Sequence, residues 1–253
     1  LGTDGISSSA YGPEEAFRYL GQHRELALFV ALGTIFTIFI ISTSYKQIIK
    51  LFPHGGGGYL VASKLLSPTV GMISGSALLI DYLLTITLSI SSGADAIFSF
   101  LPAHLHSFKL LVAVLALVLL IIINMRGVKE SVLSLTPIFF LFIATHVFII
   151  FYIFISKAGE LTDVAARSTT GFGASVSQAG FFATMLIILK AYSMGAGTFT
   201  GIEAVSNGLP ILRDPKPVTA RKTMNLMAVS LSFLVFGLLM GYALYNVEVN
   251  PLK

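Results

Sequence analysis

The sequence has 253 residues, of which 16 are Lys or Arg and 12 are Asp or Glu, so only 11% of the chain is charged. An ordinary soluble domain carries roughly 25% charged residues. With 55% hydrophobic residues and a mean hydropathy of +0.86, this chain could not cover its surface in water, and its composition predicts a membrane protein. The absence of Cys excludes disulfides, thiolate nucleophiles and Cys-ligated metal sites. The Lys and Arg residues stand singly between apolar runs, which disfavours nucleic acid as a partner.

The opening segment, Leu1–Leu20, is polar and rich in Gly and Ser, and it is neither a signal peptide nor a transit peptide. We expect the chain to be part of a longer protein. The run from Asp4 to Pro13 contains too much Gly, Ser and Pro for a continuous helix. A proline suits the first turn of a new helix, and the two Glu residues that follow it favour the positive end of that helix. We therefore expect a broken first membrane helix, with Gly5 and Gly12 at the break.

Four further segments are long and uncharged enough to cross a membrane, which requires about 20 apolar residues. Three of them are uncharged over 20 residues or more, namely Leu26–Tyr45, Ser131–Ser156 and Thr223–Val247. The fourth, Leu110–Met125, is shorter, but the Lys and Arg residues that bracket it can snorkel to the two interfaces. All four predict membrane-spanning helices.

Two more spans are interrupted by charge, and intramembrane charges often mark function. Ser67–Ser99 carries Asp81, and Ala179–Leu209 carries Lys190 and Glu203. Glycine costs about 1 kcal/mol in a helix, so the second of these spans is expected to unwind around its three closely spaced glycines, Gly195, Gly197 and Gly201. A pair of interrupted helices, one in each half of a transporter, is typical of inverted repeats with a substrate site near the bilayer midplane. The alternative is that the glycines only allow close helix packing.

Asp81 is surrounded in sequence by apolar residues, so its carboxylate should face protein or a water-filled cavity. At helical spacing it shares one face with other polar residues, namely Ser74, Thr85, Ser89 and Ser92. This polar stripe could line a cavity. The alternative is a structural ion pair between Asp81 and Lys190.

The Lys and Arg residues between the expected spans are distributed unequally, nine on one side and five on the other. The group of nine includes Lys46, Lys50, Arg221 and Lys222. By the positive-inside rule this side is cytoplasmic. The sequence thus predicts a multi-pass protein of the cell membrane, in contact with lipid, with its N-terminus in the cytoplasm.

The glycine run in His54–Tyr59 is not a phosphate-binding loop, because it lacks the Gly-Lys-Ser/Thr ending and no hydrophobic strand precedes it. We expect it to lead into an interfacial helix over Tyr59–Leu66. The sequence also shows no nucleophile with a partnered base, no metal-binding His pair and no nucleotide fingerprint. We therefore expect no enzyme activity, no cofactor and no ATP-driven transport.

Four spaced motifs resemble the amino acid–polyamine–organocation (APC) permease superfamily, and in particular its branch of KimA-type potassium–proton symporters. They are Asp4 with Tyr11–Glu15, Phe52–Tyr59, Asp81-Tyr82, and Thr200–Gly208. The resemblance implies an all-α polytopic membrane protein with a LeuT-like fold of two inverted five-helix repeats (5+5). It implies that this chain is an incomplete copy, with about seven transmembrane helices, the first and sixth broken. Residues 1–157 would form the first repeat, and residues 158–253 would begin the second.

The resemblance also implies a binding site. The cation-binding groups of the potassium branch fall on six residues of suitable type: Asp4, Tyr11, Asp81, Thr85, Thr200 and Glu203. Oxygen ligands suit a hard cation, and broken helices expose further carbonyl oxygens. In the amino acid branch, the half-helix N-termini, here near Pro13 and Thr200, would hold a substrate carboxylate instead.

The leading hypothesis is a secondary transporter that takes up potassium or an amino acid by alternating access. A proton is the expected coupling ion, because desolvation disfavours the charged form of an intramembrane carboxylate and so lets it exchange a proton. Asp81 and Glu203 are the candidate proton carriers. The alternatives are a passive channel and a polytopic membrane enzyme. A homodimer is a possible assembly.

Overall fold

The computed structural model describes residues 2–248, apart from the side chains of residues 2–4 and 128–130. Every regular element in this described range is helical. The chain forms two compact units, the first made of residues 1–76 and 147–253 and the second of residues 77–146. Two long helices, α5 (Pro68–Phe98) and α7 (Val128–Ser156), contribute residues to both units.

The first unit contains the polar opening segment and the glycine-rich segment near Thr200. In chain order its α-helices are α1 (Gly2–Ser7), α2 (Gly12–Leu20), α3 (Ala27–Leu51), α4 (Gly57–Leu65), α8 (Leu161–Ala179), α9 (Phe181–Met194), α10 (Ala204–Asn207) and α11 (Lys216–Leu244). Short 3-10 segments connect them at Ser8–Ala10, Arg24–Leu26, Ala158–Glu160, Gly195–Phe199 and Leu209–Ile211. A helix is present where one was expected over Tyr59–Leu66, namely α4, which begins at Gly57 and ends at Leu65.

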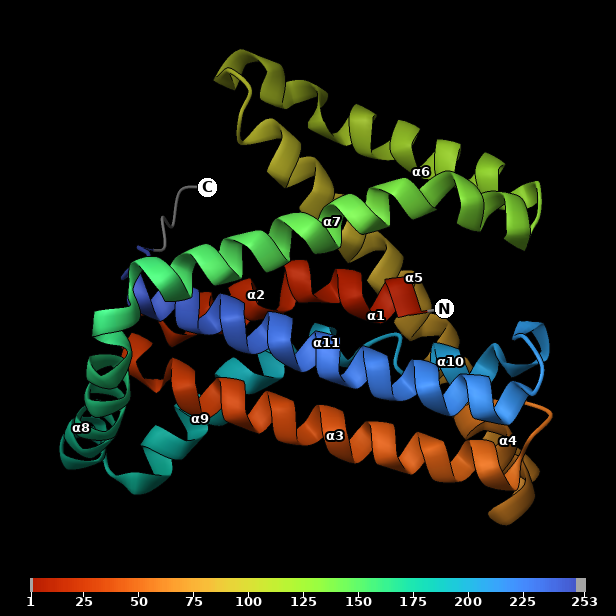
Figure 1. The fold of residues 1–253 in the computed structure, drawn as a ribbon, viewed down its shortest axis with the longest axis horizontal. Coiled ribbons are helices and arrows are strands. Elements are labelled where there is room, and N and C mark those ends of the chain that lie inside the picture. The colour runs from red at the N-terminus through yellow and green to blue at the C-terminus, as the bar shows by residue number, and fades with distance from the viewer. Residues whose placement is uncertain (1, 249–253) are drawn as a thin grey trace. The chain divides into compact units, whose positions relative to one another are not determined.

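The core of the first unit lies where α11 packs along α3, and Figure 1 shows these helices side by side in blue and orange. Their contact buries large side chains such as Ile38 and Leu231 completely. A second contact joins α2 to α9 and the 3-10 segment after α9. Phe17 and Leu20 of α2 are buried, at 2% and 1% exposure. Helix α2 therefore packs directly against the segment that contains the second group of glycines.

The second unit consists of most of α5, the 3-10 segment Ala103–Phe108, α6 (Lys109–Met125) and the first part of α7. No residue of α6 is buried, although nearly all its side chains are apolar. An ion pair between Asp95 and Lys109 connects the end of α5 to the start of α6. An apolar helix with exposed sides is suited to lipid, since these side chains would be unfavourable in water.

Six helices in the described part of the chain are long and apolar enough to cross a membrane. They are Arg24–Leu51, Pro68–Phe98, Ala103–Met125, Ser131–Ser156, Phe181–Asn207 and Lys216–Leu244. They confirm six of the expected spans. The seventh, Leu1–Leu20, is not among them, because its two helices α1 and α2 have only 6 and 9 residues.

Candidate functional site

The first helical interruption separates α1 from α2. A single 3-10 turn, Ser8–Ala10, follows α1, and Tyr11 precedes the first residue of α2. Pro13 occupies the first turn of α2, where its missing N–H costs no hydrogen bond. Glu14 and Glu15 stand in that same turn, where the helix dipole favours negative charge.

The second interruption follows α9, which ends at Met194. A 3-10 segment, Gly195–Phe199, leads to Thr200, whose backbone is extended. Gly201 then adopts φ = +82°, a left-handed conformation that suits glycine. The backbone N–H of Gly201 donates to Oε1 of Glu203 at 3.3 Å, and the single turn of α10 begins directly after Glu203. Glu203 is therefore the residue that directly precedes α10, and its carboxylate is turned back toward the N–H of Gly201.

A chain of hydroxyl groups joins the two interruptions. Tyr11 OH donates to Ser8 Oγ at 3.1 Å, Ser8 Oγ lies 3.0 Å from Thr200 Oγ1, and Thr200 Oγ1 donates to the carbonyl of Gly197 at 2.7 Å. Either hydroxyl group can be the donor between Ser8 and Thr200. Ser8 is fully buried and Tyr11 is 5% exposed, whereas Thr200 is half-buried. The hydroxyl chain thus connects residues 192 positions apart in sequence.

The two interruptions also touch through glycines. A Cβ atom on Gly12 would overlap the side chain of Thr198, and one on Gly195 would lie 2.9 Å from Cβ of Ala16. Gly5 lies inside α1, not at the break where the sequence suggested it. A Cβ there would be 3.2 Å from Sδ of Met227 and 3.4 Å from the carbonyl oxygen of Thr200. Its lack of a side chain therefore serves close packing of α1 against the second interruption.

The polar stripe of α5 follows the less exposed face of that helix. Thr85 is 6% exposed and Asp81 is half-buried, whereas the apolar residues Leu79 and Leu83 beside them are each 66% exposed. Ser74, Ser89 and Ser92 are half-buried as well. Polar groups turned inward and apolar groups turned outward are the arrangement that a surrounding bilayer requires.

The structure brings together three of the six expected binding residues, namely Tyr11, Thr200 and Glu203, within the first unit. Asp81 and Thr85 are one turn apart on α5, in the second unit, and the side chain of Asp4 lies outside the described residues. Sequence reasoning missed Ser8 and Thr198. Ser8 stands three residues before Tyr11 in a Ser-rich run, and this spacing was the available signal.

Lys190, the basic residue among the charges expected within the spans, lies close to an aromatic ring. Its Nζ atom lies 5.7 Å from the centroid of the Tyr19 ring, a cation–π distance. Tyr19 belongs to α2 and Lys190 to α9, so this contact adds to the packing between the two interrupted segments.

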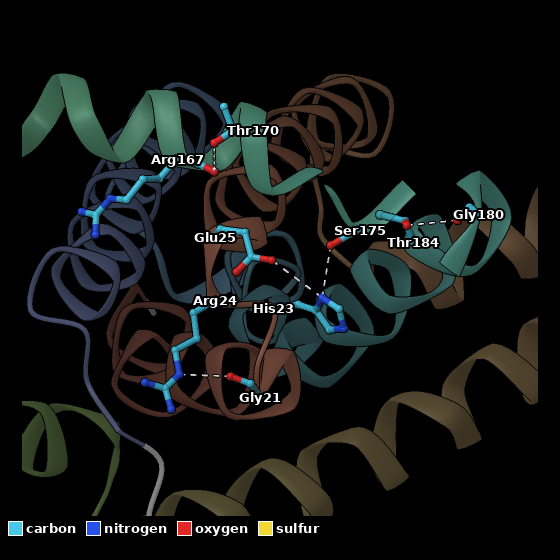
Figure 2. A network of polar contacts seen from close by, with 9 residues as sticks. All are labelled: Gly21, His23, Arg24, Glu25, Arg167, Thr170, Ser175, Gly180 and Thr184. Atoms are coloured by element: carbon cyan, nitrogen blue, oxygen red, sulfur yellow. Dashed lines mark hydrogen bonds and ion pairs between the residues drawn. The ribbon is translucent and has the colours of Figure 1, made fainter. Parts of the chain in front are cut away.

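At the other end of α2, polar contacts fix the connection to α3 against α8 (Figure 2). His23 Nδ1 lies 3.2 Å from Ser175 Oγ and 3.7 Å from Oε1 of Glu25. Arg24 Nε donates to the carbonyl of Gly21 at 3.0 Å. A Cβ on Gly171 of α8 would overlap the side chain of Glu25. Helix α8 therefore packs closely over the α2–α3 connection.

The turn from α7 to α8 contains an ion pair. Lys157 Nζ donates to Oε1 of Glu160 at 2.7 Å, and chiefly this hydrogen bond raises the pKa of Lys157. The ammonium also lies 5.4 Å from the centroid of the Tyr245 ring at the end of α11. Lys157 thus remains charged at neutral pH and links the α7–α8 turn to the end of α11.

These features define an all-helical membrane protein in which two interrupted helical segments pack against each other and share a polar chain. The family comparison agrees with this class. Residues 6–248 match the amino acid permease family, and the chain belongs to that family. It is a permease-family protein and not an enzyme.

Two relatives give the family a chemical context. The chain is 34% identical over 243 residues to the potassium transporter KimA of Bacillus subtilis. The aligned region covers 94% of this chain and 39% of KimA. The chain is 26% identical over 224 residues to the low-affinity putrescine importer PlaP of Escherichia coli, covering 87% of this chain and 45% of PlaP. The chain spans about two fifths of the length of these relatives.

Proposed function

We propose that this chain contributes the interrupted-helix site of a secondary transporter that takes up a small cation, potassium being the favoured substrate. The observation that carries this proposal is the charge at the two half-helix N-termini. Glu14 and Glu15 occupy the first turn of α2, and Glu203 directly precedes α10. A substrate carboxylate would meet these negative charges, whereas a cation would be attracted to them.

The groups at the interruptions are also the right ligands for such an ion. Tyr11, Ser8 and Thr200 bring hydroxyl oxygens together at the interruptions, and hydroxyl oxygens can act as ligands of a cation. The bends of the backbone add carbonyl oxygens, and oxygen ligands suit hard cations. The names of the two relatives, a potassium transporter and a putrescine importer, both describe cation carriers.

An amino acid substrate is the second candidate, favoured by the family that the chain matches. In that case a substrate amine would face the acidic residues, and its carboxylate would need N–H groups near Pro13 or Thr200. Glu14 stands in the same helical turn as Pro13, and Glu203 already accepts the N–H of Gly201 beside Thr200, so both acidic residues oppose a carboxylate there.

We propose a proton as the coupling ion, carried by Asp81 or Glu203. The cation and the proton would cross together, so that an inward proton gradient drives uptake as the site is exposed alternately to the two sides of the membrane. Residues 1–157 would then form the first inverted repeat and residues 158–253 the beginning of the second, with Asp81 and Thr85 completing the site together with Asp4.

The proposed topology has the N-terminus in the cytoplasm. The arrangement of the first unit is consistent with it, because the C-terminal end of α3 and the N-terminal end of α11 line one common cleft. The two connections that the charge count places on the outside, residues 21–26 and α8, also contact each other. In the first unit, two pairs of connections that the charge count assigns to the same side therefore lie together, which supports the proposed topology.

The experiment that tests the function is a radiotracer panel on the full-length protein in proteoliposomes. We expect uptake of the potassium analogue rubidium that saturates and collapses when a protonophore removes the proton gradient. Uptake of amino acids but not of rubidium would refute the cation substrate. Uptake that does not saturate and is unaffected by the protonophore would indicate a passive channel.

A second test separates the two readings of Asp81. If Asp81 is a cation or proton site, Asp81→Asn lowers uptake strongly while the protein still inserts and folds. If Asp81 forms a structural pair with Lys190, the single change costs about 3–5 kcal/mol and reduces expression. The double variant Asp81→Asn with Lys190→Gln would then restore expression.

A further inference from the structure

A basic cleft lies between the C-terminal end of α3 and the N-terminal end of α11. Its volume is about 460 Å³, within the range of small-molecule sites. Four of the residues that line it are cationic, and none of the lining residues is acidic. The cations are Lys46 and Lys50 from α3 and Arg221 and Lys222 from α11.

The charges of this cleft are not neutralised within the described side chains. Lys46 Nζ donates to Oδ1 of Asn225 at 2.9 Å, but this partner is a neutral amide. The ion pairs among the described residues use Arg18, His23, Lys109 and Lys157, all of them outside the cleft. Four cations gathered without an acid create a positive potential that attracts a polyvalent anion.

The cleft lies where apolar helix gives way to charge. The uncharged span of α3 ends at Tyr45, immediately before Lys46, and that of α11 begins at Thr223, immediately after Lys222. Both boundaries fall at the same cleft, and the end of an apolar run is where the edge of the hydrocarbon region is expected. The four cations belong to the side that the charge count assigns to the cytoplasm.

Exposed apolar side chains continue from the cleft toward the membrane interior. On α11, Leu226 follows Lys222 by four residues and is 69% exposed, and Val229 follows Asn225 by four and is 57% exposed. On α3, Phe39 precedes the lining residue Thr43 by four and is 44% exposed. Residues four apart share a helix face, so the cleft adjoins an exposed apolar surface.

We propose that this cleft binds the phosphate-bearing headgroup of an anionic phospholipid, whose acyl chains lie along the exposed apolar faces of α3 and α11. Basic pockets between membrane helices on the cytoplasmic side suit such headgroups. The fork of Arg221 can contact two phosphate oxygens at once, and the three lysines supply point charges. The adjoining apolar surface favours a lipid over free phosphate. A lipid can place its headgroup in the basic cleft and its acyl chains on the apolar surface, whereas phosphate can occupy the cleft alone. This inference does not depend on the transported substrate.

The test uses the full-length protein, purified in detergent and titrated with phosphatidylglycerol, with phosphatidylcholine and with inorganic phosphate. Binding is followed by native mass spectrometry and by thermal unfolding. We expect phosphatidylglycerol to bind and stabilise the protein, and phosphatidylcholine and phosphate to have little effect. Equal effects of the two lipids would overturn the proposal. Equal effects of phosphatidylglycerol and phosphate would overturn the assignment to a lipid and indicate a soluble anion.

Matched variants place the binding in the cleft. The double variant Lys50→Gln with Arg221→Gln removes two exposed cations, and the Kd for phosphatidylglycerol should rise about 30-fold. Lys64→Gln with Arg213→Gln removes the same charges from exposed positions outside the cleft and should leave the Kd unchanged. Equal weakening in both double variants would contradict a specific site. The exchange Lys50→Arg with Arg221→Lys changes the same two positions but keeps both charges. It should retain binding, which would show that the weaker binding of the glutamine variant comes from the lost charge and not from a damaged fold.

Discussion

The contact between the two interrupted segments is tightest at Gly12, and adding one methyl group there is a sharp test of the fold. A Cβ on Gly12 would overlap Oγ1 of Thr198 and would lie 3.1 Å from both Cβ and the backbone N of the same residue. Thr198 is 1% exposed, so its side chain has no solvent to move into. The backbone of Gly12 is not in the left-handed region, and the effect of Gly12→Ala is therefore steric.

Overpacking a close contact of this kind typically costs about 1–3 kcal/mol. We expect Gly12→Ala to lower the free energy of unfolding by that amount in a denaturant titration of the purified protein. Gly173→Ala in α8 is the matched control, because a Cβ there meets nothing within 4 Å. Alanine is the better helix former, so the control should gain up to about 1 kcal/mol.

The source of the clash can be isolated with a second change. In a Thr198→Ala background the overlapping Oγ1 atom is absent, so Gly12→Ala should cost less there than in the wild-type chain. An unchanged unfolding free energy for Gly12→Ala in the wild-type background would refute the close approach of α2 to the second interruption. An equal cost in both backgrounds would show that Thr198 is not the obstructing residue.

Two further predictions follow from the contacts and the charge distribution. In a double-mutant cycle of Ser8→Ala and Thr200→Val, the unfolding free energies should show a coupling of about 0.5–1.5 kcal/mol, since each change removes the same hydrogen bond; additive effects would argue against that bond. In cysteine labelling of intact cells, Arg213→Cys should resist an impermeant reagent and Thr162→Cys should react, because the native chain has no Cys and the two sites are expected on opposite sides. The reverse pattern would invert the topology.

The membrane spans could be predicted from sequence because bilayer thickness alone sets the length of an apolar run. Leu26–Tyr45 and Thr223–Val247, for example, correspond to the longer helices α3 and α11. Helix α3 continues beyond Tyr45 to Leu51, and α11 begins at Lys216, before Thr223. The helices are longer there because backbone hydrogen bonding continues into the charged residues that flank each apolar run. The opening segment differs, because Gly, Ser and Pro divide it into pieces too short to count as a span.

The candidate site was predictable in part. Thr200 and Glu203 were expected on the second interruption, and Tyr11 on the first, from Gly and Pro patterns and from the resemblance to the permease superfamily. The Ser8–Thr200 hydrogen bond was not, because a contact across 192 residues depends on how α2 packs on α9. The long helix α8 was also missed, since its mixed composition gives no continuous apolar run.

The most direct measurement of the central claim is rubidium uptake by the full-length protein carrying Glu203→Gln. This change keeps the size of the side chain and its acceptor oxygen toward Gly201 but removes the charge. With an inward proton gradient across proteoliposomes, we expect wild-type protein and the surface control Asp163→Asn to accumulate rubidium, and Glu203→Gln to fall to the level of empty vesicles. Wild-type uptake by folded Glu203→Gln protein would contradict a cation or proton site at the second interruption.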